Sequence, residues 1–195
     1  GDFEAGIDWI DDCLPSWAQT NNFSNHLIWH KALMLINFGQ AEQALTLFDE
    51  ALVDCLKDDF YLDVCNAASL LWRLEMKGLD LGNRWEMLRP YYHRAEDQEL
   101  VFIALHYVMV AVKNGDQAVI DAALSNLQRW AQLPQEQGRI CHAVGLETAK
   151  ALVDLAQGSA ERGVDQLMEL APELQQIGGS HAQRALFTDF IHHYS

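Results

Sequence analysis

The sequence is poor in basic residues. It has 13 lysines and arginines against 28 aspartates and glutamates, a formal net charge of −15 over 195 residues. The basic residues are scattered singly from Lys31 to Arg184 and form no stripe. A nucleic-acid-binding protein neutralises phosphates with such a stripe, and anionic membranes attract basic clusters. The composition therefore argues against nucleic acid and membranes as partners.

Cysteine is also scarce, and the four cysteines, Cys13, Cys55, Cys65 and Cys141, form no C-x-x-C pair. Structural zinc sites need closely spaced ligand pairs, and small secreted scaffolds are far richer in cysteine. Cys55 and Cys65 fall at apolar helical positions. We therefore expect them in the core of a protein from a reducing compartment, the cytoplasm.

Membrane and export signals are missing from the sequence. Its first 15 residues carry five acidic side chains and no basic one, unlike a signal peptide. The longest apolar run, residues 100–112, is broken only by His106 and has 13 residues, whereas a bilayer-spanning helix needs about 20. We expect this run to form a helix that is buried on both sides.

No segment alternates apolar and polar residues as a strand does, so the sequence predicts an all-α fold. It also contains no nucleophile–base motif, P-loop or dinucleotide-binding fingerprint. We therefore predict no catalytic residue, no cofactor and no enzymatic activity.

What the sequence does contain is glycine at regular intervals between apolar helical segments. Gly39, Gly78, Gly115 and Gly158 are 39, 37 and 43 residues apart. A helix pair that recurs about every 40 residues is typical of an α-solenoid, in which stacked neighbours bury each other's apolar faces. We predict one tetratricopeptide-like α-solenoid domain of antiparallel helix pairs in a right-handed superhelix, spanning 1–195. Its units are expected at about 1–39, 40–78, 79–115, 116–158 and 159–195.

The spacing of apolar residues and the breakers between them predict the individual helices. An opening helix is expected to stop near Pro15, and residues 21–25 to form a polar connector. Pro90 is expected to shorten one helix to Arg84–Leu88, and Pro172 is a candidate kink. The other predicted helices are 26–38, 44–55, 62–77, 100–112, 120–131, 140–156, 164–177 and 182–194.

Two kinds of motif carry a family resemblance. Gly39, Ala44, Phe48 and Ala51 have the spacing of small and large residues in a tetratricopeptide repeat. Four blocks, His26–His30 (HLIWH), Ser69–Glu75 (SLLWRLE), Gly82–Trp85 (GNRW) and Gly178–Arg184 (GGSHAQR), resemble in this order the tetratricopeptide repeat protein 38-like family. The resemblance extends from about Glu4 to Phe187. Members of that family are about twice as long, so it concerns their C-terminal half, and it implies a helical-repeat fold without a defined activity.

His26 and His30 are four residues apart on one predicted helix, so both imidazoles can face the same direction. With a carboxylate such a pair can hold a metal ion, as in zinc enzymes. No glutamate lies between them and the sequence fixes no third ligand. We therefore assign no metal site, and prefer packing or hydrogen bonding as their role.

Ser180 and Gln183 have the spacing of a capping box after the glycine pair that ends the preceding helix. Capping leaves His181 and Arg184 unexplained. Together with the free N–H groups of the helix start, these two side chains could hold a carboxylate or a phosphate. Arg73 is expected to be buried between adjacent repeats, and His106 to need a hydrogen-bond partner in its apolar helix.

From these features we expect a non-catalytic scaffold that binds a protein or peptide in the concave groove of the solenoid. The alternative is a site that binds a small molecule, an anion or a metal ion, and the chain would then be a binding protein or a cryptic enzyme. Its candidate residues are His26, His30, Arg73, His106, Ser180, His181 and Arg184.

Both end helices have apolar inner faces in the sequence, whereas solenoids normally finish in polar capping helices. The residues concerned are Ile7, Ile10 and Leu14 at one end, and Leu186, Phe187, Phe190 and Ile191 at the other. We therefore expect a fragment or truncated copy that associates with itself through an exposed end.

Overall fold

The computed structural model describes residues 2–17 and 23–195. Every regular element in these residues is a helix and none is a strand, so the prediction of an all-α fold is confirmed. The chain divides into two compact units, residues 1–82 and 83–195, which are described separately. The five-unit division predicted from the glycines stays a prediction.

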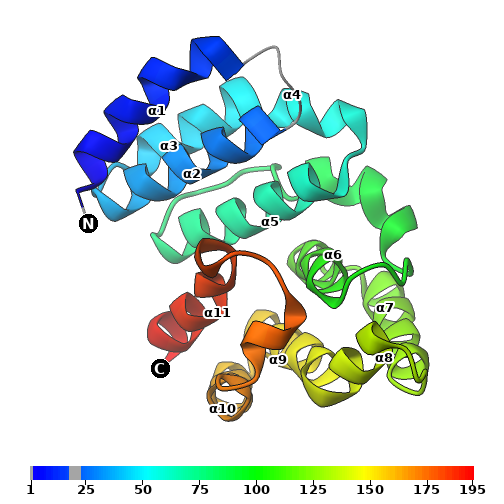
Figure 1. The fold of residues 1–195 in the computed structure, drawn as a ribbon. Coiled ribbons are helices and arrows are strands. Elements are labelled where there is room, and N and C mark those ends of the chain that lie inside the picture. Colours follow the sequence, from blue (N-terminus) through cyan, green and yellow to red (C-terminus); the bar gives the residue numbers. More distant parts are fainter. Residues whose placement is uncertain (1, 18–22) are drawn as a thin grey trace. The chain divides into compact units, whose positions relative to one another are not determined.

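Unit 1 is built around α2, which packs against α1, α3 and α5 (Figure 1). Its elements are α1 (Phe3–Trp17), α2 (Phe23–Asn37), α3 (Ala41–Leu47), the π-helical η1 (Phe48–Leu52), α4 (Val53–Cys55), the 3₁₀ helix η2 (Leu56–Asp58) and α5 (Tyr61–Met76). The segment from α3 to η2 is one nearly continuous helical stretch, which corresponds to the predicted second helix of a pair.

One predicted boundary in unit 1 is wrong. Helix α1 extends to Trp17, two residues past Pro15 and thus near the predicted stop. Helix α2 begins at Phe23, so residues 23–25 of the expected connector are helical. Asn25, in the first turn of α2, donates a side-chain hydrogen bond to Asp63 of α5. Residues 21 and 22 lie outside the described residues.

The four spaced glycines end helices as predicted. Gly39, Gly78, Gly115 and Gly158 have φ angles of 84°, 84°, 66° and 87°, a left-handed conformation in which a side chain would be strained. In each case the N–H of the next residue bonds to the carbonyl five positions earlier. These four bonds are Gln40 to Leu35 (2.8 Å), Leu79 to Leu74 (3.3 Å), Asp116 to Ala111 (3.2 Å) and Ser159 to Asp154 (2.9 Å).

Cys55 and Cys65 were both expected to be buried in the core. Cys65 is buried within α5, as predicted, whereas Cys55 is only partly buried. The difference arises because α4 runs along the surface and none of its three residues is buried. The Cys55 thiol donates to the Ala51 carbonyl at 3.1 Å.

Unit 2 begins with a 3₁₀ helix, η3 (Glu86–Arg94), where an α-helix over Arg84–Leu88 was predicted. Pro90 lies inside it and cannot donate to an α-helical ladder. The elements that follow are α6 (Val101–Lys113), α7 (Gln117–Trp130), α8 (Glu136–Ile140), the π-helical η4 (Cys141–Gly145), α9 (Leu146–Ala156), α10 (Ala160–Leu170), the 3₁₀ helix η5 (Leu174–Ile177) and α11 (His181–Tyr194).

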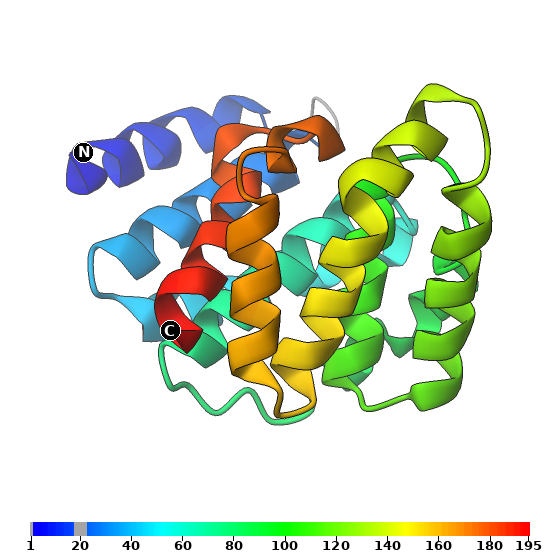
Figure 2. The same ribbon diagram turned by 90° about the horizontal axis from the view of Figure 1, so that it is seen from below.

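The helices of unit 2 pack mainly against their neighbours in the chain (Figure 2). Helix α6 contacts α7 and α9, α9 contacts α10, and α10 contacts α11. The glycine turns at Gly115 and Gly158 reverse the chain, so α6 and α7, and likewise α9 and α10, run antiparallel. The predicted helix over 164–177 is instead two elements, because α10 ends at Leu170 before Pro172.

Helix α6 is buried at every position from Val101 to Val112, as the apolar run predicted. In the described part of the chain, no helix is both long and apolar enough to cross a membrane. At the C-terminal end the expected exposure is wrong: Leu186, Phe187 and Phe190 of α11 are fully buried. In α1, Ile10 is also buried and Ile7 and Leu14 are partly exposed, so the expected apolar ends are largely covered.

Candidate functional site

A buried polar cluster joins α2 to α5 in unit 1. Nδ1 of His26 lies 3.1 Å from Oδ1 of Asn66, and Nε1–H of Trp29 donates to Oγ of Ser69 at 3.0 Å. Both bonds join residues 40 positions apart. Because the partner numbers rise together along both helices, α2 and α5 run in the same direction (Figure 1). Equivalent positions of two successive helix pairs are expected to meet in this way.

The two predicted histidines lie in contact within this cluster. The ring centroids of His26 and His30 are 4.7 Å apart, and the His26 ring stacks on Trp29 at 5.0 Å. Burial lowers the pKa of His26, although its bond with Asn66 acts in the opposite direction. Burial and then the charge of His26 lower the pKa of His30 to about 4. Both imidazoles are therefore neutral at pH 7.

Arg73 joins the same cluster from α5. Its side chain is buried, its guanidinium carbon lies 5.9 Å from the ring centroid of Trp29, and its Nη1 donates to the Ser69 carbonyl at 3.3 Å. The structure thus brings His26, His30 and Arg73 together around one tryptophan. A cation over an indole face is favourable when both are shielded from water.

Sequence reasoning missed the polar residues that complete the cluster: Asn25, Asp63, Asn66 and Ser69. Asn25 Nδ2 donates to both carboxylate oxygens of Asp63 at 3.5 Å. Burial raises the pKa of Asp63 to about 6, against the effect of that bond, and Asp58 raises it further. Nδ2 of Asn66 is buried and has no hydrogen-bond partner among the described residues. The only sequence signal for these residues is their offset of about 40 from the polar positions of α2.

His106 lies in unit 2, on α6. Its Nδ1 donates to the Phe102 carbonyl at 2.8 Å, and its ring lies 4.4 Å from that of Phe102. Gly179 also approaches the Phe102 ring, because a Cβ atom at this position would stand only 2.8 Å from Cε2 of Phe102. Gly179, just before α11, therefore packs on the helix that carries His106.

The capping box at the start of α11 is confirmed. Oγ of Ser180 accepts from the Gln183 N–H at 3.3 Å, and Oε1 of Gln183 accepts from the Ser180 N–H at 2.6 Å. Nη1 of Arg184 donates to the carbonyls of Gly178, at 3.2 Å, and Gly179. His181 is exposed. Arg184 thus binds the carbonyl groups of the preceding turn, which explains its presence without an anion.

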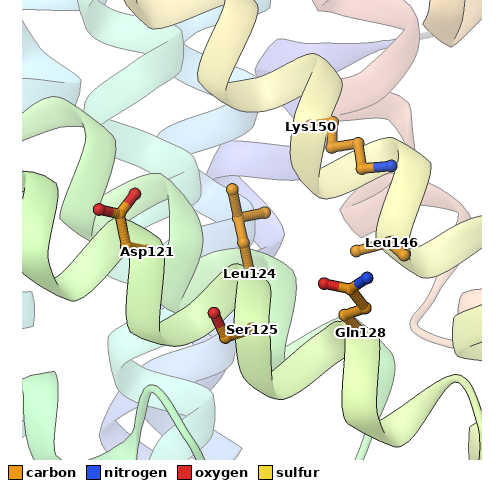
Figure 3. A pocket seen from close by; sticks show the side chains of 6 residues that line it. All are labelled: Asp121, Leu124, Ser125, Gln128, Leu146 and Lys150. Carbon is orange, nitrogen blue, oxygen red and sulfur yellow. The ribbon is translucent and has the colours of Figure 1, made fainter.

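Surface grooves form the second kind of candidate site. One, with a volume of about 320 Å³, lies between α7 and α9 (Figure 3). Leu124 points from α7 toward α9, where Leu146 and Lys150 form the opposite wall. Asp121, Ser125 and Gln128 add polar groups from α7. A second groove of about 340 Å³ lies between α1, α2 and α3 in unit 1, and a third of about 420 Å³ lies beside Trp130.

Residues 2–17 and 23–195 contain no group of three or more histidine, cysteine, aspartate or glutamate side chains that could hold a metal ion. The His26–His30 pair therefore has no third protein ligand in this part of the chain. Two neutral imidazoles alone would leave half of the positions of a four-coordinate zinc ion to water.

No protein-family model matches the chain, and no solved structure matches it. The resemblance to the tetratricopeptide repeat protein 38-like family depends on the four short sequence blocks and stays a prediction.

Proposed function

We propose that the chain is a tetratricopeptide-like helical-repeat scaffold that binds a protein or peptide partner and catalyses no reaction. The solenoid arrangement is supported by pairs of residues 40 positions apart. His26 with Asn66, and Trp29 with Ser69, form two such pairs between α2 and α5 in unit 1. The recurring glycine turns support the same repeat length.

The binding function is supported mainly by the position and lining of the surface grooves. The grooves lie where helices meet, and each has apolar side chains beside polar ones. Such surfaces suit a segment of another protein, which inserts apolar side chains and hydrogen-bonds at the rim. An enzyme site is normally an enclosed pocket with convergent polar groups. The grooves resemble such peptide-binding surfaces more than an enzyme site, and we propose that the partner binds in one of them.

A selection from a random peptide library displayed on phage, with the intact chain as target, tests this function. The enriched peptides are then synthesised with a fluorescent label and titrated with wild type and variants. Leu124→Lys alters the groove between α7 and α9, and Leu47→Lys alters the groove of unit 1. Met168→Lys is the matched control, because Met168 is 56% exposed and lies in neither groove.

We expect saturable binding that one groove variant weakens at least tenfold and the control leaves unchanged. Enrichment of no peptide, or equal binding by all three variants, would contradict the proposed function. Circular dichroism of each variant establishes that it is folded before its affinity is compared.

The second candidate is a small-molecule, anion or metal site at the α2–α5 cluster. The buried Nδ2 of Asn66 favours an anion or another hydrogen-bond acceptor there, because an amide donor without a partner costs stability unless something else accepts from it. Calorimetric titration with zinc chloride and with sodium phosphate tests this candidate. Heat that saturates in wild type and disappears in His26→Ala would establish it in place of the peptide site.

A further inference from the structure

The groove of unit 1 is lined by apolar, neutral polar and charged residues. Its apolar lining consists of Leu35, which is 4% exposed, and of Ile7 and Leu47, which are partly exposed. Its polar lining is Asp11, Lys31, Gln40, Gln43, Thr46 and Glu50. Its volume of about 340 Å³ is at the small end of ligand clefts, so it accommodates a few side chains rather than a whole ligand.

The one cation of this lining is neutralised. Lys31 Nζ lies 2.5 Å from Oδ1 of Asp11, on the opposite helix. Glu50 remains as an unbalanced charge, and it is exposed. Helix α1 contributes further carboxylates and no basic residue: its acidic residues are Glu4, Asp8, Asp11 and Asp12.

Charge is distributed unevenly between the two units. Residues 1–82 contain 14 acidic and 4 basic residues, a formal net charge of −10. Residues 83–195 contain 14 acidic and 9 basic residues, a formal net charge of −5. A cleft on a unit of such negative charge lies in its field, and that field attracts cations.

We propose that the groove between α1, α2 and α3 docks a basic amphipathic segment of the partner protein. Apolar side chains of that segment fill the space over Leu35, and lysines or arginines meet Glu50 and the carboxylates of α1. This inference rests on the proposed function and specifies the chemistry of the partner. A second copy of the chain is disfavoured, because it would bring two strongly acidic units together.

The probes that test the proposal are two labelled 16-residue amphipathic peptides, one built from leucine and lysine and the other from leucine and glutamate. Fluorescence anisotropy follows their binding to the intact chain at 20, 150 and 500 mM NaCl, concentrations that shorten the screening length progressively. The groove variants are Glu50→Lys and the milder Gln43→Lys. The matched control is Glu169→Lys, which makes the same charge change at an exposed position of α10.

We expect the leucine–lysine peptide to bind, and its affinity to fall with salt. Glu50→Lys should weaken it about tenfold at 20 mM NaCl, Gln43→Lys severalfold and Glu169→Lys less than twofold. If Glu50→Lys does not fold, the affinities of Gln43→Lys and Glu169→Lys for the leucine–lysine peptide are compared instead.

Three results would overturn the inference: equal binding of the leucine–glutamate peptide, equal losses in the groove and control variants, or no binding of the basic peptide. If library-selected peptides still bind in any of these cases, only the basic partner is refuted. If no library peptide binds either, the proposed function fails with it.

Discussion

The hydrogen bond from Trp29 to Ser69 fixes the register of α2 on α5, and its removal gives a quantitative prediction. Both residues are buried, with 0% and 2% of their surface exposed, and the Nε1 to Oγ distance is 3.0 Å. In Ser69→Ala the indole N–H stays buried without its acceptor. An unsatisfied buried donor costs about 1–3 kcal/mol, so we expect Ser69→Ala to lower the free energy of unfolding by about 2 kcal/mol.

A double-mutant cycle isolates this bond from other effects of the substitutions. Trp29→Phe removes the donor and leaves a smaller ring, at a cost of about 2–4 kcal/mol from the lost packing. In that background Ser69→Ala removes an acceptor that no longer has its donor, and should cost less than about 1 kcal/mol. The expected coupling energy is therefore about 1–2 kcal/mol.

Urea unfolding followed by circular dichroism at 222 nm measures the four free energies. Ser125→Ala combined with Trp29→Phe is the control pair, because Ser125 is exposed on α7 and its effect should be additive within about 0.5 kcal/mol. If the Trp29–Ser69 pair is additive to the same limit, the bond does not form and the 40-residue register of α2 on α5 is wrong.

Three further predictions concern protonation, close packing and capping. Since the pKa of His30 is about 4 in the folded chain and near 6.5 when unfolded, stability should fall as pH decreases from 6.5 to 4. His30→Gln should reduce this loss of stability by about 1–2 kcal/mol, a value that allows for solvent screening of the part-exposed ring. Asp63 has the opposite effect on the pH dependence, but it is present in both wild type and variant, so it cancels in the comparison. A variant with the same pH dependence as wild type would contradict the prediction. Gly145→Ala should lower the free energy of unfolding in urea by about 1–3 kcal/mol, because the new Cβ would stand 2.5 Å from Cγ1 of Val101. Most of that cost should disappear when Gly145→Ala is made in a Val101→Ala background. If the free-energy changes of the two substitutions are strictly additive, the contact is not formed. Ser180→Ala should cost about 1 kcal/mol by the same assay through loss of the capping box, and no measurable change would show that the cap is not formed.

Much of the local structure could be predicted from sequence because its causes are local. Glycine at the four helix ends adopts a left-handed conformation that other residues avoid, so the spacing of the glycines predicts where the turns lie. The apolar run broken only by His106 indicates a helix buried on every side, and the Ser180 capping box follows from two residue types three positions apart.

The features that sequence reasoning missed depend on contacts between distant residues. Asn66 has no local property that pairs it with His26, because their meeting depends on how α2 lies on α5. Arg184 was a candidate anion ligand by its charge, whereas its position in space directs it to the carbonyls of Gly178 and Gly179. Leu186 and its apolar neighbours on α11 gave no indication in sequence of being covered.

Hydrogen–deuterium exchange of the intact chain, with and without a library-selected peptide at saturation, tests the proposed binding function most directly. We expect slower exchange in helices that line a groove, either α1 and α3 or α7 and α9, because a bound segment restricts their opening. The binding-deficient groove variant should show no such change under the same conditions. Unchanged exchange throughout the chain, or protection confined to α5 around Asn66, would contradict the account.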